Sequence, residues 1–356
     1  MTMGSFVYEA LPMRVVFGPG ALASLRTETE RLGLRRVTVL STPGQRGLAD
    51  RAAALLGALA VDVFAGARMH VPVATVAAAA EAVRAADADG CVAVGGGSTV
   101  GLAKALALRH GLPFVAVPTT YAGSEMTPIW GLTENARKQT GRDRAVLPRT
   151  VLYDPELTLK LPVPVSVTSG LNAMAHAVEA LYAPDGSPVV AAMAEQGVRD
   201  LAAALPELTR GPEDLDARTA ALQGAWLCGA CLGTTTMGLH HKLAHVLGGL
   251  LDLPHADTHA VILPYVAAFN LPSAPDARAA LARALGGDAA ADKDPTRALA
   301  RLAERLGAPR TLRELGVRHE DLRRVADEVL AAPYANPRPV GRAELDGLLE
   351  RAWSGT

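Results

Sequence analysis

The first 120 residues alternate between short apolar runs rich in valine and longer alanine-rich stretches with helical spacing. Short apolar runs have the length of buried strands, and stretches of about twelve residues have the length of helices. Such alternation is typical of a parallel sheet whose faces are covered by helices. We therefore expect strands at 36–41, 61–64, 90–94 and 113–117, and helices at 75–86 and 98–109.

The second half of the chain has a different pattern. From about Val165 onward it consists of long alanine- and leucine-rich helical stretches, as in 189–205 and 217–232, with few β-branched runs. Prolines between residues 155 and 164 interrupt regular structure before this change. We predict an α/β domain at residues 1–157 and an all-helical domain at residues 158–356.

Composition limits the classes of protein. The chain has 356 residues, 49% hydrophobic content and a net charge of −1, which fit a globular enzyme with a large core and exclude a disordered or nucleic-acid-binding chain. No apolar run reaches the roughly 18–20 residues that span a bilayer, and the first residues do not resemble a signal peptide. We expect a cytoplasmic protein with no membrane or nucleic-acid partner.

The three cysteines point to a reducing compartment, because an odd number in a large chain does not suit a disulfide framework. Cys228 and Cys231 form a C-x-x-C, but they lie in an apolar run and no second pair completes a zinc site. We interpret them as buried core thiols.

A run of glycines follows the expected strand at 90–94 and opens the next helix. Backbone amides of Gly95, Gly96 and Gly97, together with the helix N-terminus, can bind a phosphate group. Ser98 is the expected N-cap of that helix. A tight turn without a ligand is the alternative. The run is not the G-x-G-x-x-G of an ordinary Rossmann domain.

A second loop, 118–125, is rich in hydroxyl groups and follows the strand at 113–117. Ligands of open α/β sheets bind at the carboxyl ends of the strands, although a surface loop is the alternative. The chain has only five lysines against thirty arginines, so a lysine near these segments is informative. The candidate nucleotide-binding residues are Ser41, Gly95, Gly96, Gly97, Ser98, Thr119, Thr120, Ser124 and Lys138.

Cofactor choice follows from the end of the strand at 36–41. Enzymes specific for NAD place a carboxylate there to bind the ribose 2′-hydroxyl. Here Ser41 and Thr42 follow the strand and no acidic residue occurs before Asp50. We expect both NADH and NADPH to be accepted.

Histidines are concentrated in a short segment of the second half, with four of the nine at positions 240–255. His241 and His245 are four residues apart and share one face of a helix. His255 follows Gly248-Gly249, where we expect the chain to turn back. Such a set of imidazoles suits a metal ion or proton chemistry.

A second pair with helical spacing, Asn172 and His176, lies about seventy residues upstream. His176 alone could be an ordinary hydrogen-bonded helix histidine. We expect His240 to face away from its neighbour, since adjacent helix residues diverge, and His259 to be structural.

These motifs carry a family resemblance. The glycine run, the 118–120 loop, the 154–157 segment and His241-x-x-x-His245 with Pro254-His255 resemble the iron-containing (group III) alcohol dehydrogenase superfamily. Within it, the chain is similar along its whole length to the maleylacetate reductase subgroup, at segments 6–18, 68–72, 121–127, 140–143, 169–176 and 334–339.

The resemblance implies a dehydroquinate synthase-like nucleotide-binding α/β domain and an all-helical catalytic domain. It implies a homodimeric enzyme that uses NADH or NADPH to reduce the C=C bond of maleylacetate to 3-oxoadipate during aromatic-compound degradation. The implied catalytic residues are His176, His241, His245 and His255. The dicarboxylate substrate requires cationic and polar anchors, for which the candidates are Tyr121, Arg142, Arg144, Asn172, Lys242 and Arg338.

The resemblance also bears on a metal. Metal-dependent relatives carry Asp where this chain has Asn172, and their other three ligands align with His176, His241 and His255. A neutral amide is a weak ligand for a divalent transition metal, so we expect no essential metal, and these three histidines would hold one if it binds. Two alternatives stay open: a metal-dependent alcohol or aldehyde oxidoreductase of this fold, and a non-redox biosynthetic enzyme of the lyase or cyclase type.

Overall fold

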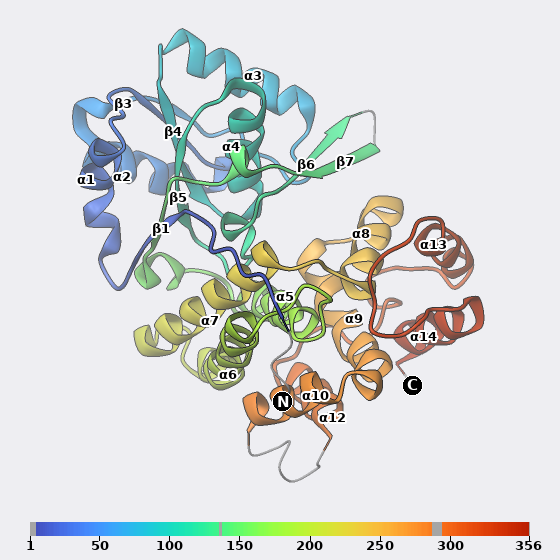
Figure 1. Cartoon of the computed structure of the whole chain (residues 1–356). Helices are drawn as coiled ribbons and strands as arrows, with labels where there is room; N and C mark the ends of the chain where they lie inside the picture. Colours follow the sequence, from blue (N-terminus) through green and yellow to red (C-terminus); the bar gives the residue numbers. More distant parts are fainter. Residues whose placement is uncertain (1–4, 135–136, 287–293, 356) are drawn as a thin grey trace. The chain divides into compact units, whose positions relative to one another are not determined.

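The computed structural model describes residues 5–134, 137–286 and 294–355, without the side chains of Arg137 and Lys138. The chain divides into two compact units (Figure 1), of which one is Leu11–Leu161 and the other is the rest of the described chain. The division falls four residues after the expected boundary at 157. Residues 5–10 group with the second unit, which the sequence did not predict.

The first unit, which we call the α/β unit, is built on six parallel strands in the order β1-β8-β5-β4-β2-β3. The expected parallel sheet is therefore confirmed. The four expected strands are present within one or two residues of their predicted ends, whereas β1 and β8 were not predicted. The strands are β1 (Arg14–Phe17), β2 (Val37–Leu40), β3 (Ala60–Phe64), β4 (Gly90–Gly95), β5 (Phe114–Pro118) and β8 (Thr150–Tyr153).

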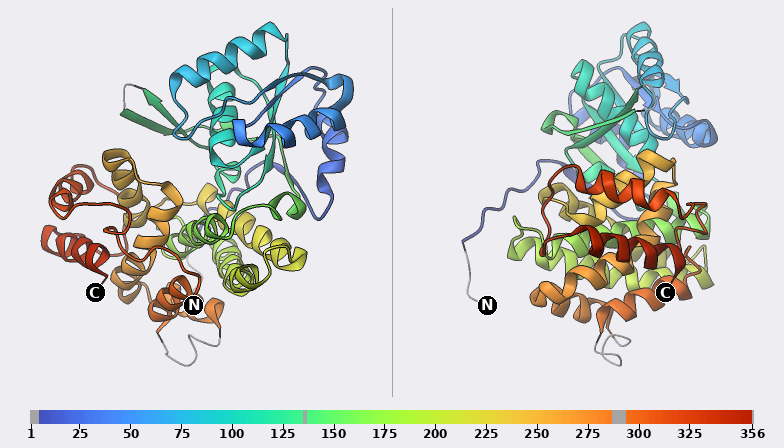
Figure 2. Two further views of the ribbon diagram at one scale, coloured as in Figure 1. Left: turned by 180° about the vertical axis from the view of Figure 1, so that it is seen from behind. Right: turned by 90° about the vertical axis from the view of Figure 1, so that its right-hand side faces the viewer.

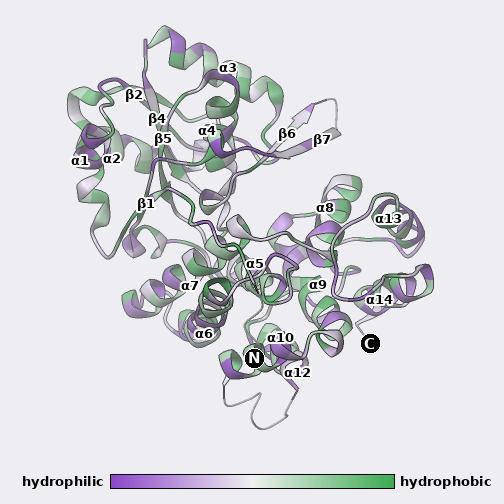
Figure 3. Cartoon of the chain, viewed as in Figure 1, coloured by the Kyte–Doolittle hydropathy of each residue, from purple (hydrophilic) through white to green (hydrophobic). Residues whose placement is uncertain are grey.

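Helices cover both faces of this sheet (Figure 1). On one face, α1 (Leu25–Arg31) and α2 (Arg46–Leu56) pack against alternate valines of the central strands. The other face carries α3 (Val73–Ala85) and α4 (Gly97–His110). Because both faces are covered, β4 and β5 are buried and apolar along their length (Figure 3).

The pairing of β4 with β5 brings the two candidate loops together. Gly95, the last residue of β4, is in register with Pro118, the last residue of β5. The glycine run and the 118–125 loop therefore leave the sheet at neighbouring positions on its carboxyl edge. This placement was expected from the sequence.

A two-stranded antiparallel hairpin, β6 (Ile129–Glu134) with β7 (Arg137–Arg142), follows the second loop. Lys104 of α4 holds its start: the buried ammonium donates to the carbonyl of Thr127 (2.8 Å), to its hydroxyl (2.9 Å) and to the carbonyl of Ile129 (2.7 Å). Burial lowers the pKa of Lys104 to about 7, against the opposing effect of Glu125.

The second unit, which we call the helical unit, contains only helices among its described elements, as predicted. Ser187 and Asp214 cap two of them, each side chain accepting backbone amides of the first turn. The helices are α5 (Val163–Ala180), α6 (Pro188–Arg210), α7 (Leu215–Thr234), α8 (Leu239–Leu251), α9 (His255–Asn270), α10 (Pro275–Leu285), α12 (Pro295–Arg305), α13 (Asp321–Leu330) and α14 (Arg342–Ser354).

An apolar core joins four of these helices. Side chains of α8, α9, α13 and α14 form one buried cluster, and α13 and α14 lie side by side (red in Figure 2). Within the described ranges, every helix is too short or too polar to cross a membrane.

The turn before His255 differs from the prediction. Gly248 and Gly249 do not break the chain but lie inside α8, which continues to Leu251. The reversal occurs at Asp252, whose φ of 53° places it in the left-handed conformation that ends many helices. A glycine inside a helix costs about 0.5–1 kcal/mol relative to alanine, and burial of Leu247 in the core offsets this cost.

Candidate functional site

The glycine run forms the junction between β4 and α4. Gly95 ends the strand with a φ of 152°, which L side chains rarely adopt, and Gly97 is the first residue of the helix. A Cβ added to Gly97 would have no atom within 4 Å. Amides in the first turn of a helix lack intrahelical acceptors. The open space beside these amides therefore suits a phosphate group.

The predicted N-cap is wrong. Gly96 occupies that position, because its carbonyl accepts from the amides of Thr99 (3.0 Å) and Val100 (3.1 Å). Ser98 is the second residue of α4 and its side chain makes no capping bond. The helix begins earlier than expected because Gly97 adopts helical geometry.

Side chains from neighbouring strand ends surround the glycine run. Gln45, which the sequence analysis missed, donates to Thr119 (2.7 Å), and the amide of Thr119 donates to the carbonyl of Gly95 (3.3 Å). A Cβ on Gly96 would lie 2.9 Å from Thr120. Ser41 is fully buried at the end of β2, and its hydroxyl has no partner among the described residues. The candidate nucleotide-binding residues at the ends of β2, β4 and β5 thus lie close together.

The other predicted residues of the α/β unit are placed less favourably. Ser124 is partly exposed and begins a single turn. Lys138 belongs to β7, but its side chain lies outside the described residues. Tyr121 is fully buried, and its contact with a substrate stays a prediction. Arg142 and Arg144 are exposed.

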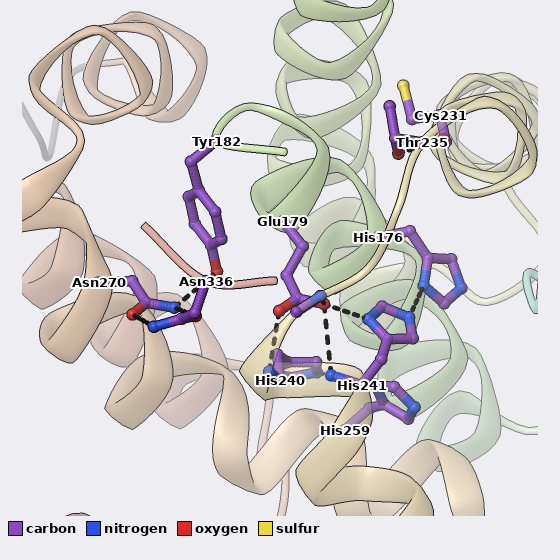
Figure 4. Close-up of polar contacts among 11 residues, drawn as sticks. His176, Glu179, Tyr182, Cys231, Thr235, His240, His241, His259, Asn270 and Asn336 are labelled. Carbon is purple, nitrogen blue, oxygen red and sulfur yellow. Dashed lines mark hydrogen bonds and ion pairs between the residues drawn. The ribbon is translucent and has the colours of Figure 1, made fainter. Parts of the chain in front are cut away.

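Six histidines of the helical unit gather into one cluster, which we call the histidine cluster. Its six rings come from three helices, and Figure 4 shows four of these rings. Both predicted pairs lie on helices, with Asn172 and His176 on α5 and His241 and His245 on α8. The centroids of neighbouring rings lie 4.4–6.3 Å apart. The rings belong to His176, His240, His241, His245, His255 and His259.

A buried hydrogen-bonded chain runs through one side of the cluster. Nδ1 of His176 lies 2.8 Å from Nε2 of His241, and Nδ1 of His241 lies 2.5 Å from the carboxylate of Glu179 (Figure 4). All three residues are at least 94% buried. Glu179 was not identified from the sequence, although it follows His176 by three residues and so shares its helix face.

One further member, His240, was misjudged from the sequence. His240 does not face away from the cluster: its Nε2 lies 2.8 Å from Nδ1 of His259. Burial, followed by the neighbouring histidines, lowers the pKa of both rings well below the ordinary value. This pair is therefore uncharged at neutral pH.

The exposed histidines lie on the other side of the cluster. His255 packs edge-on against His259 at 4.4 Å and stacks with His245 at 6.0 Å. In the part of the chain that the structure describes, no group of three or more His, Cys, Asp or Glu side chains is arranged to hold a metal ion. The conditional ligand set of His176, His241 and His255 stays a prediction.

Polar and cationic residues complete the predicted set. The side-chain carbonyl oxygen of Asn172 is buried without a hydrogen-bond partner among the described residues, so it can accept a hydrogen bond from a ligand. Lys242 is partly exposed on α8. Arg338 stacks on Phe269 at 4.2 Å and donates to Glu344 (2.8 Å), so anchoring a substrate would compete with these contacts.

Comparisons with known proteins cover both units. Residues 12–155 match the family model described as iron-containing alcohol dehydrogenase. Residues 166–353 match the model described as Fe-containing alcohol dehydrogenase family, C-terminal.

Individual relatives match over the full length. The chain is 54% identical to a maleylacetate reductase of Burkholderia cepacia over 353 residues, covering 99% of both chains. It is 52% identical to one of Pseudomonas sp. (strain P51) over 351 residues, covering 99% of this chain and 98% of the relative. The crystal structure of maleylacetate reductase from Rhizobium sp. strain MTP-10005 superimposes with a TM-score of 0.94 at 53% identity, covering 99% of each chain.

Proposed function

Because the chain belongs to the iron-containing alcohol dehydrogenase family, we propose that it uses NADH or NADPH to reduce the C=C bond of maleylacetate. The observation that carries this proposal is the identity of more than half with maleylacetate reductases over nearly the whole of both chains. Structural neighbours of the same description support it. Neither the metal-dependent alcohol or aldehyde oxidoreductase nor the non-redox enzyme is favoured by these relatives.

The reaction sets clear demands on the protein. When bound, the nicotinamide supplies a hydride to the alkene carbon β to the ketone. Electrons then move onto the ketone oxygen as an enolate, and one proton is added to the adjacent carbon to give 3-oxoadipate. The chain must therefore bind a nucleotide, hold a dianion, meet the developing enolate with a donor or cation, and deliver a proton.

The α/β unit supports the nucleotide role. The open space beside Gly97 and the helix N-terminus suit the pyrophosphate. Ser41 and Thr42 can accept either a 2′-hydroxyl or a 2′-phosphate, because the first acid, Asp50, is paired with Arg46 at 2.7 Å. Dual use of NADH and NADPH follows.

The histidine cluster supports the proton role. His176 and His241 form one hydrogen-bonded pair that can hold a proton, and the exposed rings of His245 and His255 are accessible to a ligand. Imidazolium groups supply both a positive charge for the enolate and a proton for carbon. Asn172 offers an acceptor for orientation.

The iron in the family description does not fit these residues. Asn172 supplies a neutral amide where a carboxylate would balance a divalent ion. The facing nitrogens of His176 and His241 bond to each other at 2.8 Å, and His255 packs against other rings. We therefore propose that catalysis requires no metal.

The decisive experiment is NAD(P)H oxidation with maleylacetate, measured before and after dialysis against a strong chelator, with metal content checked by elemental analysis. We expect equal rates in both samples and oxidation of both nucleotides. A protein that binds NADH but leaves maleylacetate unreduced would refute the function. Activity that is lost with the metal and restored by iron or zinc would refute only the metal-free mechanism.

A further inference from the structure

A buried lysine joins α4 to the β5–β6 loop, residues 119–128 (Figure 1). Lys104 is 1% exposed, and its ammonium donates to the carbonyl of Thr127 (2.8 Å), the hydroxyl of Thr127 (2.9 Å) and the carbonyl of Ile129 (2.7 Å). Lysine is rarely buried so completely, because removing its charge from water is costly. An apolar side chain would fill the same space without that cost, so the hydrogen bonds themselves need a reason.

The contacts of Lys104 fix the shape of the loop where it leads into β6. The hydroxyl and the amide of Thr127 both donate to the carbonyl of Ser124 (3.1 and 3.2 Å), and the hydroxyl accepts from the amide of Ile129 (3.3 Å). Ser124 is a candidate nucleotide-binding residue. Ile129 begins β6, which pairs with the strand that carries Lys138, another candidate. Lys104 therefore supports the backbone on which both candidates depend.

Other contacts hold the rest of the same loop. At its start, the amide of Thr119 donates to the carbonyl of Gly95 in the glycine run (3.3 Å). In its middle, the phenol of Tyr153 on β8 donates to the carboxylate of Glu125 (2.6 Å), and both side chains are buried. The loop is thus fixed to the α/β unit at its start, middle and end, and Lys104 supplies the attachment at the end.

From this geometry we propose that Lys104 is a positioning residue for nucleotide binding, and that its ammonium holds the β5–β6 loop in the shape that places it beside the glycine run. Lys104 acts through the loop, because its hydrogen bonds go to Thr127 and Ile129. The inference rests on the proposed function for the identity of the nucleotide, NADH. The attachment of the loop to α4 is a property of the protein alone.

The strength of this attachment depends on the charge of Lys104. An ammonium has three N–H donors for the three acceptors, whereas a neutral amine has two donors and a lone pair. On deprotonation, one acceptor loses its donor, or the hydroxyl of Thr127 turns toward Nζ and releases the carbonyl of Ser124. Burial lowers the pKa of Lys104 to about 7, and Glu125 opposes this shift. We therefore expect nucleotide affinity to fall as the pH rises through this value.

Other titratable groups on α4 and on the elements packed closely against it have to be separated from Lys104. Burial raises the pKa of Glu125 and raises that of Cys91 on β4 to about 12. The remaining groups on these elements are exposed: Glu81, Arg84, Arg109, His110, Glu134 and Arg144. All of them are present in the wild type and in a Lys104 variant, so the difference between the two proteins reports on Lys104.

Three variants isolate the hydrogen bonds of Lys104. Lys104→Met removes the donors and keeps a long side chain. Leu106→Ala is the matched control, because Leu106 is fully buried on the same helix and its truncation leaves a cavity, but its side chain has no hydrogen bond to give the loop. Thr127→Val is a milder change that keeps both carbonyls for Lys104 and removes the hydroxyl.

The experiment measures the Kd of NADH by fluorescence titration without maleylacetate, at about pH 6.5 and about pH 8.5, on either side of the pKa of Lys104. Thermal unfolding checks that each variant is folded. We expect the wild-type Kd to rise about threefold or more between the two pH values. Loss of hydrogen bonds should raise the Kd of Lys104→Met about tenfold at the lower pH and remove most of its pH dependence. Leu106→Ala should unfold at a lower temperature with a wild-type Kd.

Two outcomes would overturn the proposal directly. One is a folded Lys104→Met protein with the wild-type Kd, and the other is an equal loss of affinity in Leu106→Ala, which would assign the effect to general damage to α4. If Lys104→Met does not fold, Thr127→Val decides: we expect a Kd raised about threefold, and wild-type affinity at both pH values would overturn the proposal. NADH binding as expected in a protein that leaves maleylacetate unreduced would refute only the proposed reaction.

Discussion

Gly97→Ala separates phosphate binding from folding more cleanly than any other change in the glycine run. A Cβ on Gly95 would lie 2.4 Å from the hydroxyl of Thr99 and would need a φ of 152°, and one on Gly96 would lie 2.9 Å from Thr120. Substitution at either position therefore damages packing whether or not a nucleotide binds. At Gly97 the Cβ meets nothing within 4 Å.

The expected magnitudes have opposite signs. Replacing a helical glycine by alanine stabilises a protein by about 0.4–1 kcal/mol where the backbone is compatible. The same methyl group would occupy the space in which a phosphate approaches the helix amides. Loss of one hydrogen bond to a charged group costs about 1.5–3 kcal/mol, which corresponds to a weakening of NADH binding by roughly tenfold or more.

The assay combines thermal unfolding with NADH titration by fluorescence. Gly347→Ala is the control, because Gly347 lies within α14 and its added Cβ would make only an ordinary contact of 3.4 Å with Arg351. We expect both variants to be at least as stable as the wild type and only Gly97→Ala to lose NADH affinity. Unchanged affinity in a folded Gly97→Ala protein would remove the glycine run from the nucleotide site.

Three further predictions concern other groups. The pKa of Lys104 is lowered to about 7 in the folded protein, so between this pH and the ordinary pKa of 10.5 the unfolded chain binds more protons than the folded one. The free energy of unfolding of the wild type, measured in urea, should therefore rise with pH across this range relative to that of Lys104→Met. Parallel curves for the two proteins would contradict this. Burial raises the pKa of Cys91 and Cys231 to about 12 and also raises the pKa of Cys228, so mass spectrometry should find no alkylation of the native protein by iodoacetamide. Arg338→Met should cost at most about 1 kcal/mol of stability, as exposed ion pairs do, but raise KM for maleylacetate about tenfold; an unchanged KM would exclude this arginine as an anchor.

Local spacing in the sequence was sufficient for much of the site. Helix periodicity alone puts His176 on the same face as Asn172, and His245 on the same face as His241, and both pairs lie on helices as predicted. The ends of β4 and β5 were predictable because neighbouring parallel strands end at one edge of a sheet.

Contacts between helices were beyond this reasoning. Glu179 carries no motif of its own, and its role depends on how α5 packs against the start of α8. His240 was misjudged because the first turn of α8 is buried on several sides, so adjacent residues can both face neighbours. Gly248 and Gly249 resemble a break in sequence, but tertiary packing decides whether such a pair continues a helix.

The close packing around Gly238 limits which residues this position can tolerate. A Cβ at this position would lie 2.6 Å from the backbone carbonyl of Ala335 and 3.1 Å from Glu179, so no side chain fits without moving the carboxylate that holds His241. We therefore expect a side chain at position 238 to displace the carboxylate of Glu179 as well as the chain at Ala335. Paired with His176 and His241, Glu179 and Gly238 make a diagnostic signature, His-x-x-Glu on one helix and Gly-x-x-His at the start of another. Among homologues of this fold, that signature should separate chains able to build the same imidazole–carboxylate chain from those that share only the architecture.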